Sequence, residues 1–338
     1  MARSRVRVGV IGAGSIAQIA HIPGWKRCAH VELVAVCDPD RARASAVARK
    51  FSIPRVETDF EDLLRNGEVD AVDICTPNHL HAPIAVAALQ SGSDVLCERP
   101  LARNAAEAQS MVEASRRYDR ILMCALNSRF RRDVQILRQF VAKGELGQVF
   151  HARVGWMRRR HGGESDRWKA DRGTAGGGVL LDLGVPAIDL CLWVMGHPAV
   201  EAVSGAVHRP RQDRVEDSAV GMLRLEGGSV ITVEVSWSHI LEKDVDWFQL
   251  FGSRGAGRIQ PLEIHKEMHG NLVNVTPQVA STRNVYKLSY AQEIEHFADC
   301  VRRRTQPMSP GEHGLALMRL TDAIYASAEA GREAVPES

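Results

Sequence analysis

A glycine-rich turn between a strand and a helix constrains this chain more than any other feature of its sequence. Residues 6–17 (VRVGVIGAGSIA) place Gly12-x-Gly14-x-x-Ala17 directly after an apolar run and at the start of a helical pattern. Gly12 permits a tight turn, Gly14 lets a pyrophosphate approach the backbone, and Ala17 lets helix and strand pack closely. The helix N-terminus also attracts the anion. This context favours a dinucleotide-binding loop over a purely structural glycine turn.

An acidic residue follows the next apolar run at the spacing that such a site requires. Residues 31–37 (VELVAVC) are expected to form the second strand, and Asp38 follows it, about 20 residues beyond the glycine turn. A carboxylate there accepts hydrogen bonds from a ribose 2′-hydroxyl and repels a 2′-phosphate, which favours NAD over NADP. Arg41 and Arg43 follow closely and could weaken that preference, or they could be solvated helix residues.

The pattern of the chain changes near residue 127. Before it, Val- and Ile-rich runs alternate with helical stretches, which predicts an α/β, doubly wound parallel sheet of the Rossmann type over residues 1–126. After it, runs with strand alternation and two closing helices predict an α+β domain with a mostly antiparallel sheet over residues 127–338. Strands of the first domain are expected at 6–11, 31–37, 69–75, 94–97 and 121–126.

The composition excludes several classes of partner. A net charge of +2 is too small to indicate binding of nucleic acid or of an acidic membrane surface. No run of about 18 apolar residues lacks a charge, and the basic start (MARSRVRVGVIG) has no signal-peptide pattern, so neither a membrane span nor secretion is expected. The 7 cysteines form no CxxC pair, which favours free thiols in a reducing cytoplasm.

Two more turns end strands of the predicted parallel sheet, at the edge that faces a cofactor in such folds. The run ICTPNHLH leads into Thr76-Pro77-Asn78, with His81 in the first helical turn, and VLCERP leads into Glu98-Arg99-Pro100. His79 and His81 could touch cofactor or substrate, or they could cap and pack the helix start.

Together these motifs resemble the Gfo/Idh/MocA oxidoreductases, the family of glucose–fructose oxidoreductase and inositol dehydrogenase. The resemblance covers nearly the whole length. It implies an NAD-binding Rossmann domain and a C-terminal domain with a large open sheet. One face of that sheet would roof the substrate site, and the other would form a homodimer or homotetramer. The resemblance also includes NSRF (127–130), GELGQV (144–149), GGGVLLDLG (176–184) and the helices from Tyr290.

The cofactor-binding candidates come from the strand-end turns and from the start of NSRF. They are Gly12, Gly14, Ser15, Ile16, Asp38, Thr76, Pro77, Asn78, His81, Glu98, Arg99 and Asn127.

The chain departs from the family at two positions that carry its chemistry. Family members have Glu-Lys-Pro, whose Lys helps to move the proton of the substrate hydroxyl, and Asp-x-Gly-x-His-x-x-Asp, whose His is the acid/base. Here the Lys position is Arg99 and the second motif is DLGVPAID, with Asp182 and Asp189 kept but Pro186 in place of His. Arg stays charged, with a pKa above ~12, and loss of a positioned acid/base costs about 10²–10⁴ in rate.

Three explanations remain open. Another group could handle the proton, and Asp182 and Asp189 come from the matching motif. Together with Arg99 they are the catalytic candidates. Alternatively, the substrate could be an imine or another activated electrophile, with Arg99 fixing a carboxylate or phosphate. Finally, the chain could be a catalytically weak NAD-binding partner subunit or sensor. Arg99 could also reflect a drift from Lys that keeps only the charge. Other proton-handling residues that are plausible by position are His151, His161, His239, Tyr286 and Tyr290.

Two further features bear on the substrate. Arg158, Arg159 and Arg160, followed by His161, lie on a predicted strand and could recognise an acidic substrate or be solvated edge charges. Pro186 is tolerated if its helix begins near Gly184, and it bends the helix if that begins near Gly178. The expected substrate is a small polar metabolite, such as a sugar, a cyclitol or a derivative, with an anionic one left open. No metal site is expected.

Overall fold

The computed structural model describes residues 5–65, 67–159, 167–211, 214–278 and 284–337. The chain divides into two compact units. The first contains residues 1–127 and 284–318, and the second contains residues 128–283 and 319–338. The first unit therefore includes a late helix in addition to the residues before 127.

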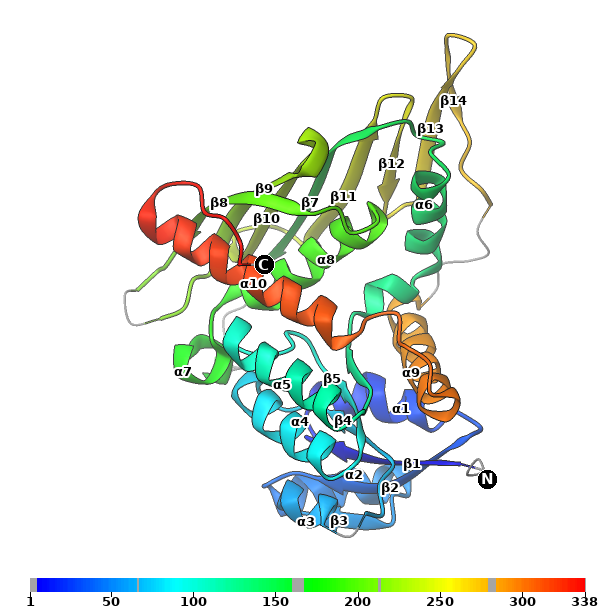
Figure 1. The fold of residues 1–338 in the computed structure, drawn as a ribbon, viewed down its shortest axis with the longest axis vertical. Coiled ribbons are helices and arrows are strands. Elements are labelled where there is room, and N and C mark those ends of the chain that lie inside the picture. Colours follow the sequence, from blue (N-terminus) through cyan, green and yellow to red (C-terminus); the bar gives the residue numbers. More distant parts are fainter. Residues whose placement is uncertain (1–4, 66, 160–166, 212–213, 279–283, 338) are drawn as a thin grey trace. The chain divides into compact units, whose positions relative to one another are not determined.

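A six-stranded parallel sheet with strand order β3-β2-β1-β4-β5-β6 forms the centre of the first unit. Every residue of β4 and β5 is buried, because helices lie on both sides of the sheet (Figure 1). The predicted doubly wound Rossmann sheet is confirmed. Its strands are β1 (Val6–Ile11), β2 (Val31–Cys37), β3 (Arg55–Glu57), β4 (Ala71–Ile74), β5 (Asp94–Cys97) and β6 (Leu122–Cys124).

The helices of the first unit connect these strands and cover them. Helix α4 packs on α5, and α1 packs on α9, which follows the second unit in the chain. The helices are α1 (Ile22–Trp25), α2 (Arg41–Phe51), α3 (Phe60–Leu64), α4 (His81–Gln90), α5 (Ala105–Arg117) and α9 (Val285–Arg303), with a π-helical turn η1 (Ala17–His21) and a 3₁₀ turn η2 (Asn78–Leu80).

An eight-stranded, mostly antiparallel sheet forms the second unit, as predicted. Among the described strands of this sheet, only β10 and β7 pair in parallel. Buried and exposed residues alternate along β9, because one face of an antiparallel sheet packs on the core and the other faces outward. Its strands are β7 (Val149–Arg159), β8 (Val200–His208), β9 (Ser218–Leu225), β10 (Val230–His239), β11 (Val245–Gly252), β12 (Gly255–Ile259), β13 (Glu263–Met268) and β14 (Asn271–Asn274).

The covered face of this sheet packs against α6 (Arg132–Ala142), α8 (Val185–Val194) and the part of α10 (Gly311–Ala330) that follows Met318. The remaining short elements are η3 (Asn127–Phe130), η4 (Arg167–Ala170), α7 (Arg172–Ala175), η5 (Leu180–Gly184) and η6 (Glu226–Gly228).

Two π-helical turns precede helices that carry Pro in their first turn. Turn η1 leads into α1 with Pro23, and η5 leads into α8 with Pro186. Proline has no N–H to donate, and its ring crowds the carbonyl four residues earlier. A widened turn accommodates that ring, and such turns are frequent at functional sites. The helical run that contains Pro186 begins at Val179, near Gly178, and the π-helical turn η5 is where it adapts to the proline.

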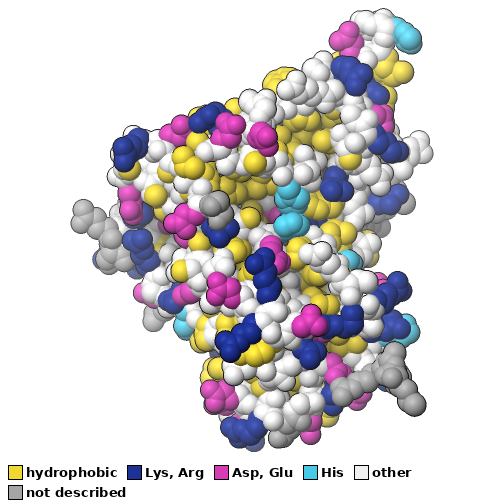
Figure 2. Space-filling model, viewed as in Figure 1, with side chains coloured by type: hydrophobic (Ala, Val, Ile, Leu, Met, Phe, Trp, Pro, Cys, Tyr) yellow, Lys and Arg dark blue, Asp and Glu magenta, His cyan; other side chains and the backbone are white. Residues whose placement is uncertain are grey.

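One helical stretch, Arg172–Val194, is long and apolar enough to cross a membrane by length and composition alone. It is 89% buried within the structure, as the core helix of a folded domain is. On the face shown in Figure 2, side chains of both charge signs are interspersed, in line with the net charge of +2.

Candidate active site

The glycine turn contains one position where the fold itself requires glycine, Gly12, and one where an added side chain would meet no protein atom, Gly14. Gly12 has a φ of +97°, and a Cβ there would lie 2.4 Å from the carbonyl oxygen of Cys75. A Cβ on Gly14 would meet nothing within 4 Å. The helical run then extends from Ser15, through Ile16, to Trp25. The open space at Gly14, next to a helix start, fits the pyrophosphate of a dinucleotide.

Asp38 fixes the glycine turn from the end of β2. Its buried carboxylate accepts hydrogen bonds from the backbone N–H of Ala13 at 2.9 Å and of Asp40 at 3.0 Å. Arg43 lies 3.4 Å from the same carboxylate and 3.2 Å from that of Asp40. Arg43 is thus paired with the acid that is expected to hold the ribose, whereas Arg41 is exposed.

The turn after β4 contains a buried hydroxyl without a protein partner. Among the described residues, Thr76 Oγ1 is buried and makes no hydrogen bond. Pro77 precedes η2, whose first residue, Asn78, is buried. An orphaned buried hydroxyl is costly, and at the carboxyl edge of the sheet a cofactor or a water would satisfy it. This observation, like the space at Gly14, fits a bound dinucleotide.

His81 connects this turn to the Glu98-Arg99-Pro100 turn. Its two ring nitrogens lie 2.9 Å from the carbonyl oxygens of Thr76 and Pro100. Burial lowers the pKa of His81. Both nitrogens face protein atoms, so the structure places His81 as a brace between the turns. Asn127 similarly donates from Nδ2 to Ser289 Oγ at 3.0 Å.

Glu98 ends in a buried polar network that the sequence did not reveal. His21 Nε2 lies 2.8 Å from one Glu98 oxygen, and His21 Nδ1 lies 3.0 Å from both oxygens of Asp73. Trp25 donates its indole N–H to Asp73 at 2.6 Å. The other Glu98 oxygen accepts the backbone N–H of Arg99 at 2.9 Å. The network therefore positions the backbone of Arg99, the residue at the family's Lys position.

The charges in this network support one another. Burial by itself lowers the pKa of His21, but the negative charge of Asp73 raises that pKa well above its usual value. Burial opposes ionisation of Glu98, but the hydrogen bond and charge of His21 lower the pKa of Glu98. His21 is accordingly an imidazolium between two carboxylates, a paired arrangement that a buried charge requires.

Two more titratable groups from α9 lie near this network, and burial disfavours the charged form of each. Burial, and then the charge of Glu98, raise the pKa of Glu293 well above its usual value, and neither of its oxygens has a hydrogen-bond partner among the described residues. Burial also raises the pKa of Tyr290, whose ring centroid lies 5.4 Å from that of His21. Tyr286, which is 51% exposed, donates to the Tyr290 hydroxyl at 3.5 Å.

His21, Asp73 and Cys75 also have the geometry of a possible metal site, with ligand atoms within 4.8 Å of one another. Hydrogen bonds from His21 and Trp25 already occupy the Asp73 carboxylate. Burial, and then the charge of Asp73, raise the pKa of the Cys75 thiol to about 12, which disfavours the thiolate that a metal needs. These contacts account for the cluster without an ion.

Asp182 lies in η5 of the second unit, among cationic and aromatic side chains. It accepts a hydrogen bond from Trp237 Nε1 at 3.1 Å, and it lies 3.4 Å from Arg158 and 3.7 Å from Lys169. Arg158 also stacks over the Trp156 ring at 4.9 Å. This arrangement keeps a carboxylate next to donors and flat rings, which are suited to a hydroxylated ligand.

Asp182 and Pro186 are the only residues of the stretch 177–194 that are not buried. Asp189 is 1% exposed and is held by Arg129, which is fully buried, through Nε at 3.1 Å and a short contact at 2.5 Å. That ion pair joins α8 to η3. The structure thus separates the two retained acids into one that is partly exposed, Asp182, and one that is paired with Arg129 in the core, Asp189.

The remaining proton-handling candidates are placed less favourably. His151 contacts Thr232 at 3.3 Å and stacks on Phe251, and His239 is exposed. His161 and Arg160 lie outside the described residues. Arg159, at the end of β7, contacts Asp244 and Glu242, unlike Arg158.

The residues that the sequence analysis missed are His21, Asp73, Trp25, Arg129 and Glu293. One signal was available for Asp73, because an acid inside the apolar run VDAVDIC of a strand buried on both faces requires a partner. No comparable signal identifies the partner as His21, which is far away in the chain.

The chain is similar to known proteins over both units. Residues 6–126 match the family described as an oxidoreductase family with an NAD-binding Rossmann fold, and residues 138–336 match its C-terminal alpha/beta domain. D-glucoside 3-dehydrogenase of Escherichia coli is 28% identical, over 98% of this chain and 97% of that protein. A putative UDP-kanosamine synthase oxidoreductase subunit of Amycolatopsis mediterranei is 28% identical, over 98% and 99%.

A solved structure of levoglucosan dehydrogenase in complex with NADH has the same fold. It covers 99% of this chain and 100% of its own, with a TM-score of 0.90 and 21% sequence identity.

Proposed function

This chain belongs to the Gfo/Idh/MocA family of NAD-binding oxidoreductases, and we propose that it transfers a hydride between NAD and a small polar metabolite of the sugar or cyclitol class. The sugar-directed names of its relatives support the substrate class. The free space at Gly14 and the orphaned hydroxyl of Thr76 support the cofactor site.

The observation that carries the proposal is the partial exposure of Asp182, whose side chain is 15% exposed. Within the stretch 177–194, the acids are Asp182 and Asp189, and Arg129 holds Asp189 in the core. Asp182 is partly exposed, as is Pro186, the position where the family has its His. We therefore assign the acid/base role to Asp182, which has Arg158 and Lys169 beside it as donors.

Bound NAD supplies the hydride acceptor or donor, and the protein supplies position and charge. Gly12 and Gly14 shape the loop for the pyrophosphate, and Asp38 binds the ribose. The Arg43 charge next to Asp38 weakens discrimination against NADP without removing it. Arg99 remains protonated, so its part is to donate hydrogen bonds to a substrate oxygen and to stabilise negative charge there, not to remove a proton.

The alternative is an NAD-binding partner subunit with little turnover of its own. The simultaneous change at Arg99 and Pro186 favours it, since both proton-handling groups of the family are absent. A second enzymatic possibility is a reductase of imines, because hydride transfer to an imine needs little help from an acid of the protein. In either case we place the protein in the cytoplasm, because its seven cysteines are free thiols and six of them are buried. We also propose a homodimer or homotetramer formed through the outward face of the second sheet, where Val220 and Met222 are exposed.

The test combines cofactor binding with turnover. NADH binding is first measured by fluorescence, and NADH absorbance is then followed at high protein concentration against sugars, ketosugars and imines. We expect turnover of one sugar-class substrate and a loss of about 10²–10⁴ in kcat for Asp182→Asn. A flat trace with every substrate, despite proven NADH binding, would support the subunit instead.

A paired substitution tests the two departures from the family. Arg99→Lys with Pro186→His restores both missing groups, and we expect it to raise the rate of sugar oxidation. Pro186→Ala with Arg99→Lys is the matched control, since it removes the ring but adds no acid/base. Equal rates for the two double variants would show that position 186 does not take part.

A further inference from the structure

The first unit has a cavity at the amino ends of its parallel strands, the end of the sheet opposite the glycine turn. Its volume is about 460 Å³. It is lined by residues at the amino ends of β1, β4 and β5, by Arg120 before β6, and by the end of α9. Strand β1 alone separates this edge from the glycine turn by about 17 Å, at 3.3 Å per residue. The cavity is therefore separate from the candidate cofactor site.

Arginines dominate the charge of this cavity. The charged residues that line it are Arg5, Arg120, Arg302, Arg303, Arg304, Asp70 and Asp94. Both acids are already neutralised, because Asp70 pairs with Arg7 at 3.0 Å and Asp94 pairs with Arg304 at 2.7 Å. Asp299 is shared by Arg302 at 3.2 Å and Arg303 at 3.8 Å. An excess of positive charge remains.

Helix α9 explains only part of this excess. Cations at the last turn of a helix interact favourably with its dipole, so residues 302–304 need no ligand to account for them. Arg5 and Arg120 come from other elements, and neither has an ion-pair partner among the described residues. They face the same cavity, although like charges repel.

Arg120 is the strongest single indication of a ligand. Its Nε is buried and makes no hydrogen bond within the described parts of the chain. Its guanidinium lies over Gly92, with Nη2 3.8 Å from the place where a Cβ would be. A buried charged donor without an acceptor is costly, and an anion in the cavity would satisfy it.

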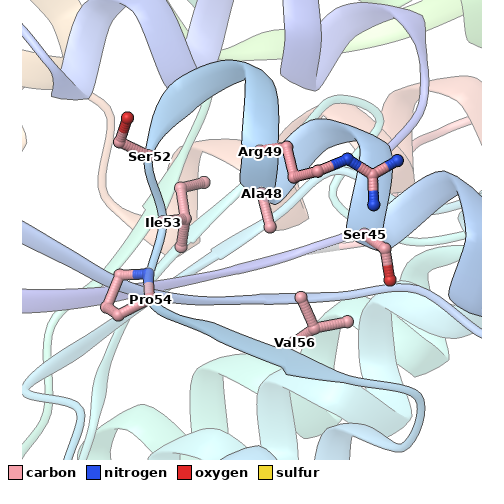
Figure 3. Close-up of a pocket in the computed structure, with 7 residues that line it drawn as sticks. All are labelled: Ser45, Ala48, Arg49, Ser52, Ile53, Pro54 and Val56. Atoms are coloured by element: carbon pink, nitrogen blue, oxygen red, sulfur yellow. The ribbon is translucent and has the colours of Figure 1, made fainter.

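A second pocket of the same unit provides a contrast (Figure 3). It lies between the end of α2 and the start of β3, and its single charged residue is Arg49. In Figure 3 the Arg49 side chain is drawn beside Ser45 and Ala48, with no second cation among the labelled residues. A single arginine beside a pocket is therefore not unusual on this unit. The first cavity differs, because five arginines from three parts of the chain line it.

We propose that the arginine-lined cavity binds a multivalent phosphate-type anion, as part of a small phosphorylated metabolite. Guanidinium groups hold phosphate oxygens in bidentate pairs, which suits a cluster of arginines more than of lysines. The volume lies within the range of small-molecule sites and exceeds the need of a single inorganic phosphate. The ligand would bind whether or not the cofactor site is filled.

Inorganic pyrophosphate is the probe for this site, titrated by calorimetry at constant ionic strength. Because pyrophosphate could also enter the glycine turn, the protein is first saturated with NADH and the titration is then repeated without it. We expect one binding event with the same affinity in both titrations. Arg120→Gln and Arg5→Gln should each weaken it about tenfold or more, as loss of a charge-assisted hydrogen bond does.

Arg49→Gln is the matched control, because it removes one arginine from the other pocket of the same unit. We expect it to change the affinity less than about twofold. Arg5 is exposed, so its variant folds even if Arg120→Gln does not. Absence of binding to the wild-type protein, or equal weakening by Arg49→Gln and Arg5→Gln, would overturn the proposal.

Discussion

The Nε2 atom of His21 lies 2.8 Å from a carboxylate oxygen of Glu98. The opposite ring nitrogen contacts Asp73 in β4, and the second Glu98 oxygen accepts the N–H of Arg99. One imidazole therefore ties the helix after the glycine turn to a central strand and to the turn that presents Arg99. The glycine turn and the Glu98-Arg99-Pro100 turn are thus connected through this side chain.

Replacement of His21 should remove this tie and leave two buried carboxylates facing each other. We expect His21→Asn to lower the free energy of unfolding by about 3–5 kcal/mol, as breaking one side of a buried pair does. Urea unfolding of the wild-type protein and of His21→Asn measures this difference in the free energy of unfolding.

The same pair should make stability depend on pH. The pKa of His21 is raised in the folded state, so its contribution is complete below the unfolded pKa of about 6.5 and is lost as pH rises through the folded value. The pKa of Glu98 is lowered, so its contribution is complete above about pH 4.5 and is lost as pH falls. The difference between wild type and His21→Asn should be greatest between these limits. The exposed His30 offers a control, since His30→Asn should show no such profile.

The two loop glycines should respond differently to the same added methyl group. Gly12→Ala places a Cβ 2.4 Å from a backbone oxygen at a positive φ, so it should cost more than about 2 kcal/mol of stability. Gly14→Ala meets no protein atom and should leave stability within about 0.5 kcal/mol. If the space belongs to a pyrophosphate, Gly14→Ala should weaken NADH binding about tenfold or more. Unchanged NADH affinity in a stable Gly14→Ala protein would place the cofactor elsewhere.

Glu293 should tolerate loss of its acidity. Burial raises its pKa well above the usual value, so the folded state favours the protonated acid, and this favours folding less as pH rises above about 4.5. Glutamine is close in shape to that acid and carries no charge. We expect Glu293→Gln to be neutral or to stabilise by up to about 1 kcal/mol near pH 7.

Glu98→Gln is the comparison for this substitution. It should destabilise the protein, because it removes the charge that His21 requires. A loss of stability in Glu293→Gln as large as that in Glu98→Gln would contradict the assignment of a neutral Glu293.

Substitution of the two acids of the DLGVPAID motif should affect different properties, stability for Asp189 and activity for Asp182. Asp189→Asn leaves the buried Arg129 without its counter-charge and should cost about 3–5 kcal/mol. Asp182→Asn, at a partly exposed position, should change stability by less than about 1 kcal/mol and lower kcat instead. Thermal unfolding and NADH-linked rates measure the two effects, and the reverse assignment would exchange them.

Much of the fold was predictable, because hydrophobic period and turn chemistry are local. The strands 6–11, 31–37 and 94–97 have the expected bounds, since each is a mostly apolar run that ends at Gly12, Asp38 or Glu98. The short β3 and β12–β14 were not anticipated. Three of these four strands are largely unburied, so no alternation of apolar residues marks them.

The candidate site was predictable only in part. Gly12, Gly14 and Asp38 follow from a motif whose members lie close in the chain. The relations of His21 to Glu98, of Arg129 to Asp189 and of Arg120 to Gly92 join residues that are distant in sequence, and no local pattern encodes such pairs.

The sequence by itself determined that this chain builds a Rossmann sheet with a dinucleotide loop, because that follows from apolar period and glycine spacing along a short segment. Only the tertiary structure decided which ionisable groups carry charge. Whether a carboxylate is paired, neutral or open to a ligand depends on burial and on the neighbours that folding brings to it. That is why Asp189 pairs with Arg129 in the core, burial favours the protonated form of Glu293, and Asp182 remains partly exposed.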